Sequence, residues 1–278
     1  MPFQDGLAYP FVLDAVLAVA ALHKAYVEPE HSKKYMSACL YYQNQCLYAY
    51  QKELANINED NCHAIFAVSA LVHILNIAIS PGGPTLSPTP PIETLLLQFQ
   101  LTRGIMVVLS TAWHTVSTAH YKGLFKIPGY NTPTNAVNTP EVAYAMEELQ
   151  RCVANTESTD TTVQNVYKTS VESLGNHFKH VEQGGDLNAI VAWPIHLDDK
   201  AEQLLADRDP LMMLICVHYG VLCLHVHDKW WAHNFGCRLI WELSDSLHAL
   251  EASWLPLTSW ARSKAASIRA ASADLKLR

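Results

Sequence analysis

Residues 209–227 form an almost entirely apolar stretch, and it is apolar on every face of the helix that it predicts. Asp209 and Pro210 suit the start of a helix, and the run LMMLICVHYGVLCLHVH follows them. Trp230 and Trp231 come shortly after this run. A helix without a polar face belongs in the interior of a large helical body. The pattern therefore predicts a central helix over about 210–228.

Apolar residues recur at helical spacing along most of the remaining chain. No window alternates strictly between apolar and polar residues, and no repeat of 20–50 residues occurs. Segments rich in Pro and Gly at 80–91 and 126–140 predict loops, which are too short to be linkers between domains. We therefore expect an all-α fold, a single domain over residues 1–278 with nine or ten helices around an apolar pocket. The helices are expected at about 7–27, 30–56, 61–79, 92–120, 140–154, 161–181, 196–207, 210–228, 230–250 and 255–277.

The composition indicates an intracellular protein with a large core. Hydrophobic residues make up 50% of the chain and charged residues 16%, and the net charge of −7 argues against nucleic-acid binding. The seven cysteines are odd in number and include no CxxC pair, so we expect free, reduced thiols and a cytoplasmic or nuclear location. No signal peptide is recognised at the start.

Two apolar segments, 61–79 and 211–226, are interpreted as core helices, and no membrane span is expected. The first contains His63, His73 and Asn76. The second has about 16 residues, whereas a spanning helix needs about 20.

No motif for phosphate, dinucleotide or serine-nucleophile chemistry is present. The histidines His218, His225, His227 and His233 are the most suggestive cluster. On a helix, however, His225 and His227 project to different sides, and His218 lies about 10 Å from His225 along the axis. Zinc-binding helices use i, i+4 spacing. We therefore expect no metal and no cofactor, and we interpret these histidines as hydrogen-bonded core or pocket residues.

A body of this kind can enclose a small apolar molecule. Trp230 and Trp231 either complete the core or stack on a ligand, and Met212 and Met213 either fill gaps or form an adaptable pocket wall. Polar groups on the apolar helices either find partners in the core or orient a ligand. The candidate ligand-binding residues are His114, Met212, Met213, Cys216, His218, Tyr219, Trp230 and Trp231.

Several short segments occur in a recognisable order. They are AYPFVL (8–13), LAVAALH (17–23), YQKEL (50–54), NCHAIFAVS (61–69), RGI (103–105), WP (193–194), DPL (209–211), HYGVL (218–222), WW (230–231) and RLI (238–240), followed by Trp254 and Trp260. Their succession resembles the C-terminal regulatory domain of fungal zinc-cluster transcription factors of the sterol uptake control type. The resemblance implies an all-α regulatory domain with a deep apolar pocket, which in the sterol-sensing members binds ergosterol and controls nuclear entry and activation. It also implies dimerisation through helices, so a homodimer is expected.

The chain departs from this family in one respect, because the six-cysteine zinc cluster that binds DNA and its basic flanks are missing from the sequence. The chain is therefore expected to be either a fragment or a protein reduced to the pocket domain.

Two main functions fit these observations. The first is a sensor domain that binds a sterol- or terpenoid-like molecule between the helices at about 61–79, 99–120 and 210–233, with His114, His218 and Tyr219 as anchors. The alternative is a stand-alone fungal natural-product cyclase of the Diels–Alder type, which would fold an apolar substrate without metal or cofactor. A third possibility is a scaffold with a solid core that binds another protein.

Overall fold

The protein is described by a computed structural model that covers residues 9–79, 91–118, 137–156, 160–184, 190, 193–232 and 234–276. Side chains at 91, 109, 111–118 and 271–276 lie outside the description. The described residues form ten α-helices and four short 3₁₀ helices, with no strand among them, which confirms the predicted all-α fold and helix number. The α-helices are α2 (Pro10–Val27), α3 (Ser32–Leu54), α4 (Cys62–Ile79), α5 (Pro91–Thr118), α6 (Pro140–Asn155), α7 (Thr161–Glu182), α9 (Asp199–Ala206), α10 (Pro210–Cys223), α11 (Phe235–Leu250) and α12 (Leu255–Lys276).

The helices belong to two compact units. Unit 1 comprises Met1–Thr89 and Leu97–Lys126, and unit 2 comprises Pro90–Leu96 and Ile127–Arg278. Helix α5 therefore contributes its first turns to unit 2 and the rest to unit 1. Each unit is described by itself, and the expectation that both belong to a single domain stays a prediction.

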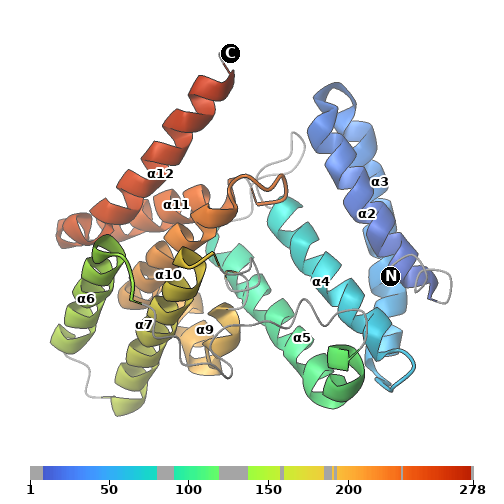
Figure 1. Cartoon of the computed structure of the whole chain (residues 1–278), viewed down its shortest axis with the longest axis horizontal. Helices are drawn as coiled ribbons and strands as arrows, with labels where there is room; N and C mark the ends of the chain where they lie inside the picture. Colours follow the sequence, from blue (N-terminus) through green and yellow to red (C-terminus); the bar gives the residue numbers. More distant parts are fainter. Residues whose placement is uncertain are drawn as a thin grey trace. The chain divides into compact units, whose positions relative to one another are not determined.

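Unit 1 is built around α4, which packs on its neighbours through two apolar clusters. In one cluster, Ala64, Val68 and Val72 of α4 pack with α2 and α3, and Leu101 of α5 packs against them. In the other, Cys62, Ile65, Phe66 and Ala67 pack with Val108 of α5. Figure 1 shows α4 and α5 running in opposite directions beside one another, and α2 lying along α3.

Unit 2 is built around α10, whose every residue from Leu211 to Cys223 is buried. Helices α6, α7, α9, α11 and α12 contact it (Figure 1). The Asp209 carboxylate caps the helix by accepting a hydrogen bond from the Met212 amide at 2.8 Å. The prediction of a central helix without a polar face is confirmed.

The helix boundaries after α10 differ from the prediction. α10 ends at Cys223 and the chain continues as a 3₁₀ helix, η4 (Leu224–Val226), so the helix expected to reach 228 is shorter. The following backbone bonds, from Lys229 to Val226 and from Ala232 to Lys229, close successive turns rather than an α-helix. Helix α11 consequently begins at Phe235, not at 230.

Two helices of unit 1, α2 and α4, are long and apolar enough to cross a membrane by length and composition. In α4, 61% of the apolar window is buried inside the protein, and in α2 28% is buried. A third candidate combines α9 with residues 210–226, and the two parts are bent by 102° at the break between them. The interpretation of 61–79 and 211–226 as core helices agrees with the burial of α4 and α10, and the expected absence of a membrane span stays a prediction.

Candidate functional site

The predicted ligand-binding residues of the central helix are tightly packed. Met212 and Cys216 are fully buried, and Met213 is 1% exposed. Burial also raises the pKa of the Cys216 thiol, which therefore stays protonated and unreactive. The other cysteines are likewise free, and all except the half-buried Cys152 are buried.

His218 lies in the interior of unit 2, where it makes a hydrogen bond and a ring contact. Its Nδ1 is 3.0 Å from the Leu214 carbonyl oxygen, and its ring stacks on Trp260 at a centroid distance of 5.5 Å. Burial lowers the pKa of His218 to about 4, and the hydrogen bond to Leu214 only partly opposes this. The imidazole is therefore neutral near pH 7.

Tyr219 is also buried and partnered within the core. Its ring stacks on Trp193 at 4.5 Å, and its hydroxyl donates to the Ile190 carbonyl oxygen at 3.1 Å. Trp230 and Trp231 are half-buried in the turn before α11. The side chain of His114 lies outside the described residues. That these residues bind a ligand stays a prediction.

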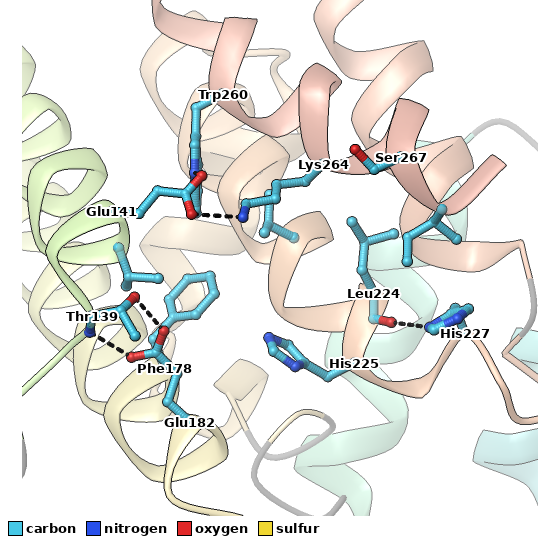
Figure 2. Close-up of a pocket in the computed structure, with 13 residues that line it drawn as sticks. Thr139, Glu141, Phe178, Glu182, Leu224, His225, His227, Trp260, Lys264 and Ser267 are labelled. Carbon is cyan, nitrogen blue, oxygen red and sulfur yellow. Dashed lines mark hydrogen bonds and ion pairs between the residues drawn. The ribbon is translucent and has the colours of Figure 1, made fainter. Parts of the chain in front are cut away.

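An open cleft in unit 2 lies beside the predicted residues (Figure 2). It has a volume of about 380 Å³ and is formed by the start of α6, the end of α7, the end of α10, η4 and α12. Its lining residues are Thr139, Glu141, Val142, Phe178, Glu182, Val221, Leu224, His225, His227, Trp260, Lys264, Ser267 and Ile268.

The cleft has an apolar floor with an aromatic centre. Phe178, Val221 and Leu224 line it and are buried. The Trp260 ring packs against the Phe178 ring at a centroid distance of 6.1 Å, and it also stacks on His218. Through Trp260, the floor of the cleft therefore contacts His218, one of the predicted ligand-binding residues.

Two carboxylates hold the rim of the cleft in place (Figure 2). Glu141 accepts a hydrogen bond from Trp260 Nε1 at 2.9 Å and forms an ion pair with Lys264 at 2.7 Å. The Lys264 hydrogen bond, with a smaller contribution from Trp260, lowers the pKa of Glu141. Glu182 accepts from the Thr139 amide at 2.8 Å and from its hydroxyl at 2.6 Å. The rim therefore presents charged groups that are already oriented.

His225 and His227 close the cleft on the side of η4. His227 Nδ1 is 2.7 Å from the Leu224 carbonyl oxygen. Removal of water from the His225 ring lowers its pKa, while the Glu182 carboxylate acts in the opposite direction. No group of three His, Cys, Asp or Glu side chains among the described residues is arranged to hold a metal ion. The expected absence of metal and cofactor stays a prediction.

Reasoning from the sequence did not find most of this cleft. Thr139, next to Pro140, is a good capping residue, yet its hydroxyl makes no cap and donates to Glu182 instead. Glu141 lies 123 residues from Lys264, and no local pattern joins them. Trp260 entered the sequence analysis only through the family resemblance, because its position in the sequence does not indicate which residues its indole contacts.

The comparisons with known proteins give one distant relationship. No family model matches the chain, and no solved structure matches it. The chain is similar to a Zn(2)-C6 fungal-type transcription factor of Gibberella zeae, with 22% identity over 276 residues. The similarity covers 92% of this chain but 53% of that protein, so the chain spans about half the length of its relative. Nearly the whole chain is therefore related to part of a fungal transcription factor.

Proposed function

We propose that this chain is a regulatory domain that binds a sterol- or terpenoid-like molecule in the cleft of unit 2. The observation that carries the proposal is the combination of an aromatic, apolar floor with a charged and hydrogen-bonding rim. Small-molecule sites are typically apolar concavities of about 300–1,000 Å³ with a few placed polar groups. The cleft, at about 380 Å³, has the size and lining of such a site.

An amphipathic ligand suits this lining. Its apolar body would cover Trp260, Val221 and Leu224, and each square ångström removed from water contributes about 25 cal/mol. A hydroxyl on the ligand would lie at the rim, where Lys264 donates and Glu182 accepts hydrogen bonds. This placement moves the proposed ligand contacts away from Met212, Met213 and Cys216, which are packed in the core.

The relationship to a fungal transcription factor supports a regulatory role. The relative's name describes a zinc-cluster protein, and the sequence of this chain lacks the six-cysteine cluster that would bind DNA. We therefore propose an intracellular protein, cytoplasmic or nuclear, that senses a ligand through this chain and does not bind nucleic acid through it. Assembly as a homodimer belongs to the same proposal.

Native mass spectrometry of the purified chain, followed by solvent extraction, would identify a retained ligand. Added back, the ligand should raise the melting temperature. Ser267→Trp places an indole in the cleft from an exposed position of α12 and should abolish this effect without loss of folding. Ala266→Trp is the matched control, because Ala266 is also exposed on the same helix and does not line the cleft.

Each result distinguishes the proposal from its alternatives. Stabilisation that survives Ser267→Trp would place the ligand elsewhere and contradict the proposal. Conversion of a linear polyene or terpenoid precursor to an isomer of identical mass would identify the cyclase. If nothing is retained and nothing is converted, the scaffold function is favoured.

A further inference from the structure

Two positively charged side chains meet at one aromatic ring where α11 contacts α12. The guanidinium carbons of Arg262 and Arg269, both in α12, lie 4.0 and 5.1 Å from the centroid of the Trp241 ring in α11. Both cations are therefore close to the same ring, although like charges repel each other. None of the three residues lines the cleft, so this group is a separate feature of unit 2.

The charges of this group do not balance. Asp245 forms an ion pair with Arg262, and the distance between Arg262 Nη1 and Asp245 Oδ1 is 2.6 Å. Among the described residues, no carboxylate pairs with Arg269, whose side chain contacts the ring instead. A cation–π contact attracts a guanidinium to a ring but does not neutralise its charge. The group thus contains two cations and one anion, and one further negative charge would balance it.

The same group has hydrogen-bond donors that lack an acceptor. The Trp241 Nε1 atom is buried, and no partner accepts its hydrogen among the described residues. An indole N–H can only donate, and a guanidinium offers five N–H groups and no acceptor. Buried polar atoms nearly always have a partner, so the indole N–H requires an acceptor. An oxyanion supplies both the missing charge and the missing acceptor.

Exposure and charge determine which oxyanion fits. Arg269 is exposed, and the side chains of Arg262 and Asp245 are 26% and 66% exposed. A group bound here therefore stays at the surface, as in a contact with a partner protein. A carboxylate carries the single negative charge that is missing, and its two oxygens match the planar guanidinium fork. A phosphate monoester carries a charge of about −1.5 to −2 and would exceed the balance.

We propose that Trp241, Arg262 and Arg269 form a docking site for a carboxylate on an acidic segment of a partner protein. Arg269 pairs with this carboxylate and the indole N–H of Trp241 donates to it, while Arg262, held by Asp245, adds positive charge beside it. The net charge of the whole chain is −7, which repels acidic segments elsewhere, so this local excess of positive charge directs them to one place. The site does not rest on the function proposed for the cleft.

The indole N–H of Trp241 reports occupation of the site directly. In NMR spectra of the full chain with isotope-labelled tryptophan, the indole resonance that is absent from Trp241→Phe belongs to this residue. N-acetylglutamate N-methylamide should shift this resonance in a saturable way, with a Kd in the millimolar range, and the uncharged glutamine analogue should not. Arg269→Gln should weaken the binding about tenfold, as expected when a charge-assisted hydrogen bond is lost.

Arg151→Gln is the matched control for the loss of charge. Arg151 also lies near an aromatic ring, that of Tyr144, and pairs with Glu148, but it has no second guanidinium beside it among the described residues. Its replacement should leave binding of the glutamate analogue unchanged. Circular dichroism would show that each variant keeps its helices. No shift with the glutamate analogue, an equal shift with the glutamine analogue, or equal losses in Arg269→Gln and Arg151→Gln would overturn the proposal.

Further probes distinguish the proposed partner from other sources of an oxyanion. A blocked oligoglutamate peptide should bind more tightly than the single glutamate, because its neighbouring carboxylates raise their own local concentration at the site. Equal affinities would assign the site to a free organic acid instead. Tighter binding of the phosphoserine analogue than of the glutamate analogue would overturn the choice of a carboxylate. A shift of the Trp241 resonance on concentrating the protein alone would replace the partner protein by a second copy of this chain.

Discussion

The hydroxyl of Tyr219 provides the clearest test of a single contact. It donates to the Ile190 carbonyl oxygen at 3.1 Å inside unit 2. Tyr219→Phe leaves the ring stacked on Trp193 and leaves that carbonyl without this donor, so the free energy of unfolding should fall by about 1.5 kcal/mol. Urea denaturation would measure the change. Tyr41→Phe, at a side chain that is 60% exposed, is the control and should be neutral within about 0.5 kcal/mol.

Residue-level reasoning from the sequence was right about burial and limited about contacts. An apolar stretch on every helical face could only be satisfied in a core, and Met212, Met213 and Cys216 are buried there. The partners of Tyr219 and His218 could not be inferred, because Trp193 and Trp260 reach them from distant segments. Side-chain pairs of this kind depend on how helices cross, which a single sequence does not specify.

At the scale of elements, the crossing of α10 and α11 depends on two glycines. A Cβ at Gly236 would lie 2.8 Å from the Gly220 carbonyl oxygen and 3.0 Å from the Leu224 amide nitrogen, and backbone atoms cannot move aside easily. Gly236→Ala should therefore lower the free energy of unfolding by about 1–3 kcal/mol. Thermal or chemical denaturation would measure it.

Gly104 is the matched control for this prediction. It also lies within a helix, α5, but is exposed, and a Cβ there would meet nothing within 4 Å. Gly104→Ala should raise stability by up to about 1 kcal/mol, since Ala is the better helix former. Equal effects of the two substitutions would show that helix propensity, not the close crossing, determines the cost at Gly236.

The start of α10 was predicted correctly, and its end was not. Asp209 before Pro210 is a strong start signal, and α10 begins there with the predicted cap. After Cys223 the sequence continues with Leu224, His225 and Val226 and contains no Pro or Gly, so its pattern gave no reason to end the helix. The end is set by tertiary packing, because Gly236 must lie against Gly220 and the chain has to turn back between them.

At the scale of the whole molecule, the all-α class followed from helical periodicity without strand-like alternation. The division into two units did not, because it lies within α5, where the sequence continues as one helix. The cleft could not be predicted from the sequence either, because its rim depends on the contact of Glu141 in α6 with Lys264 in α12. Local patterns report which faces are buried, and they do not report which helices share a surface.

Buried neutral histidines make the stability of both units dependent on pH. Burial lowers the pKa to about 4 for His73 in unit 1 and for His177 and His218 in unit 2. Between pH 6.5, near their ordinary pKa, and pH 4, the unfolded chain binds protons that the folded chain does not. The free energy of unfolding therefore decreases as the pH is lowered through this window. Each group contributes up to about 1.4 kcal/mol per pH unit.

Urea denaturation between about pH 7 and pH 5 would measure this slope. His218→Phe keeps an aromatic ring beside Trp260 and removes one of the titrating groups, so the slope should become shallower by up to about 1.4 kcal/mol per pH unit. The lowered pKa of Glu141 acts in a separate window below its ordinary value of 4.5, since a carboxylate with a lowered pKa loses its stabilising effect only as it protonates. A loss of stability confined to that lower range, with no slope between about pH 6.5 and 5, would therefore attribute acid unfolding to Glu141 and not to the buried histidines.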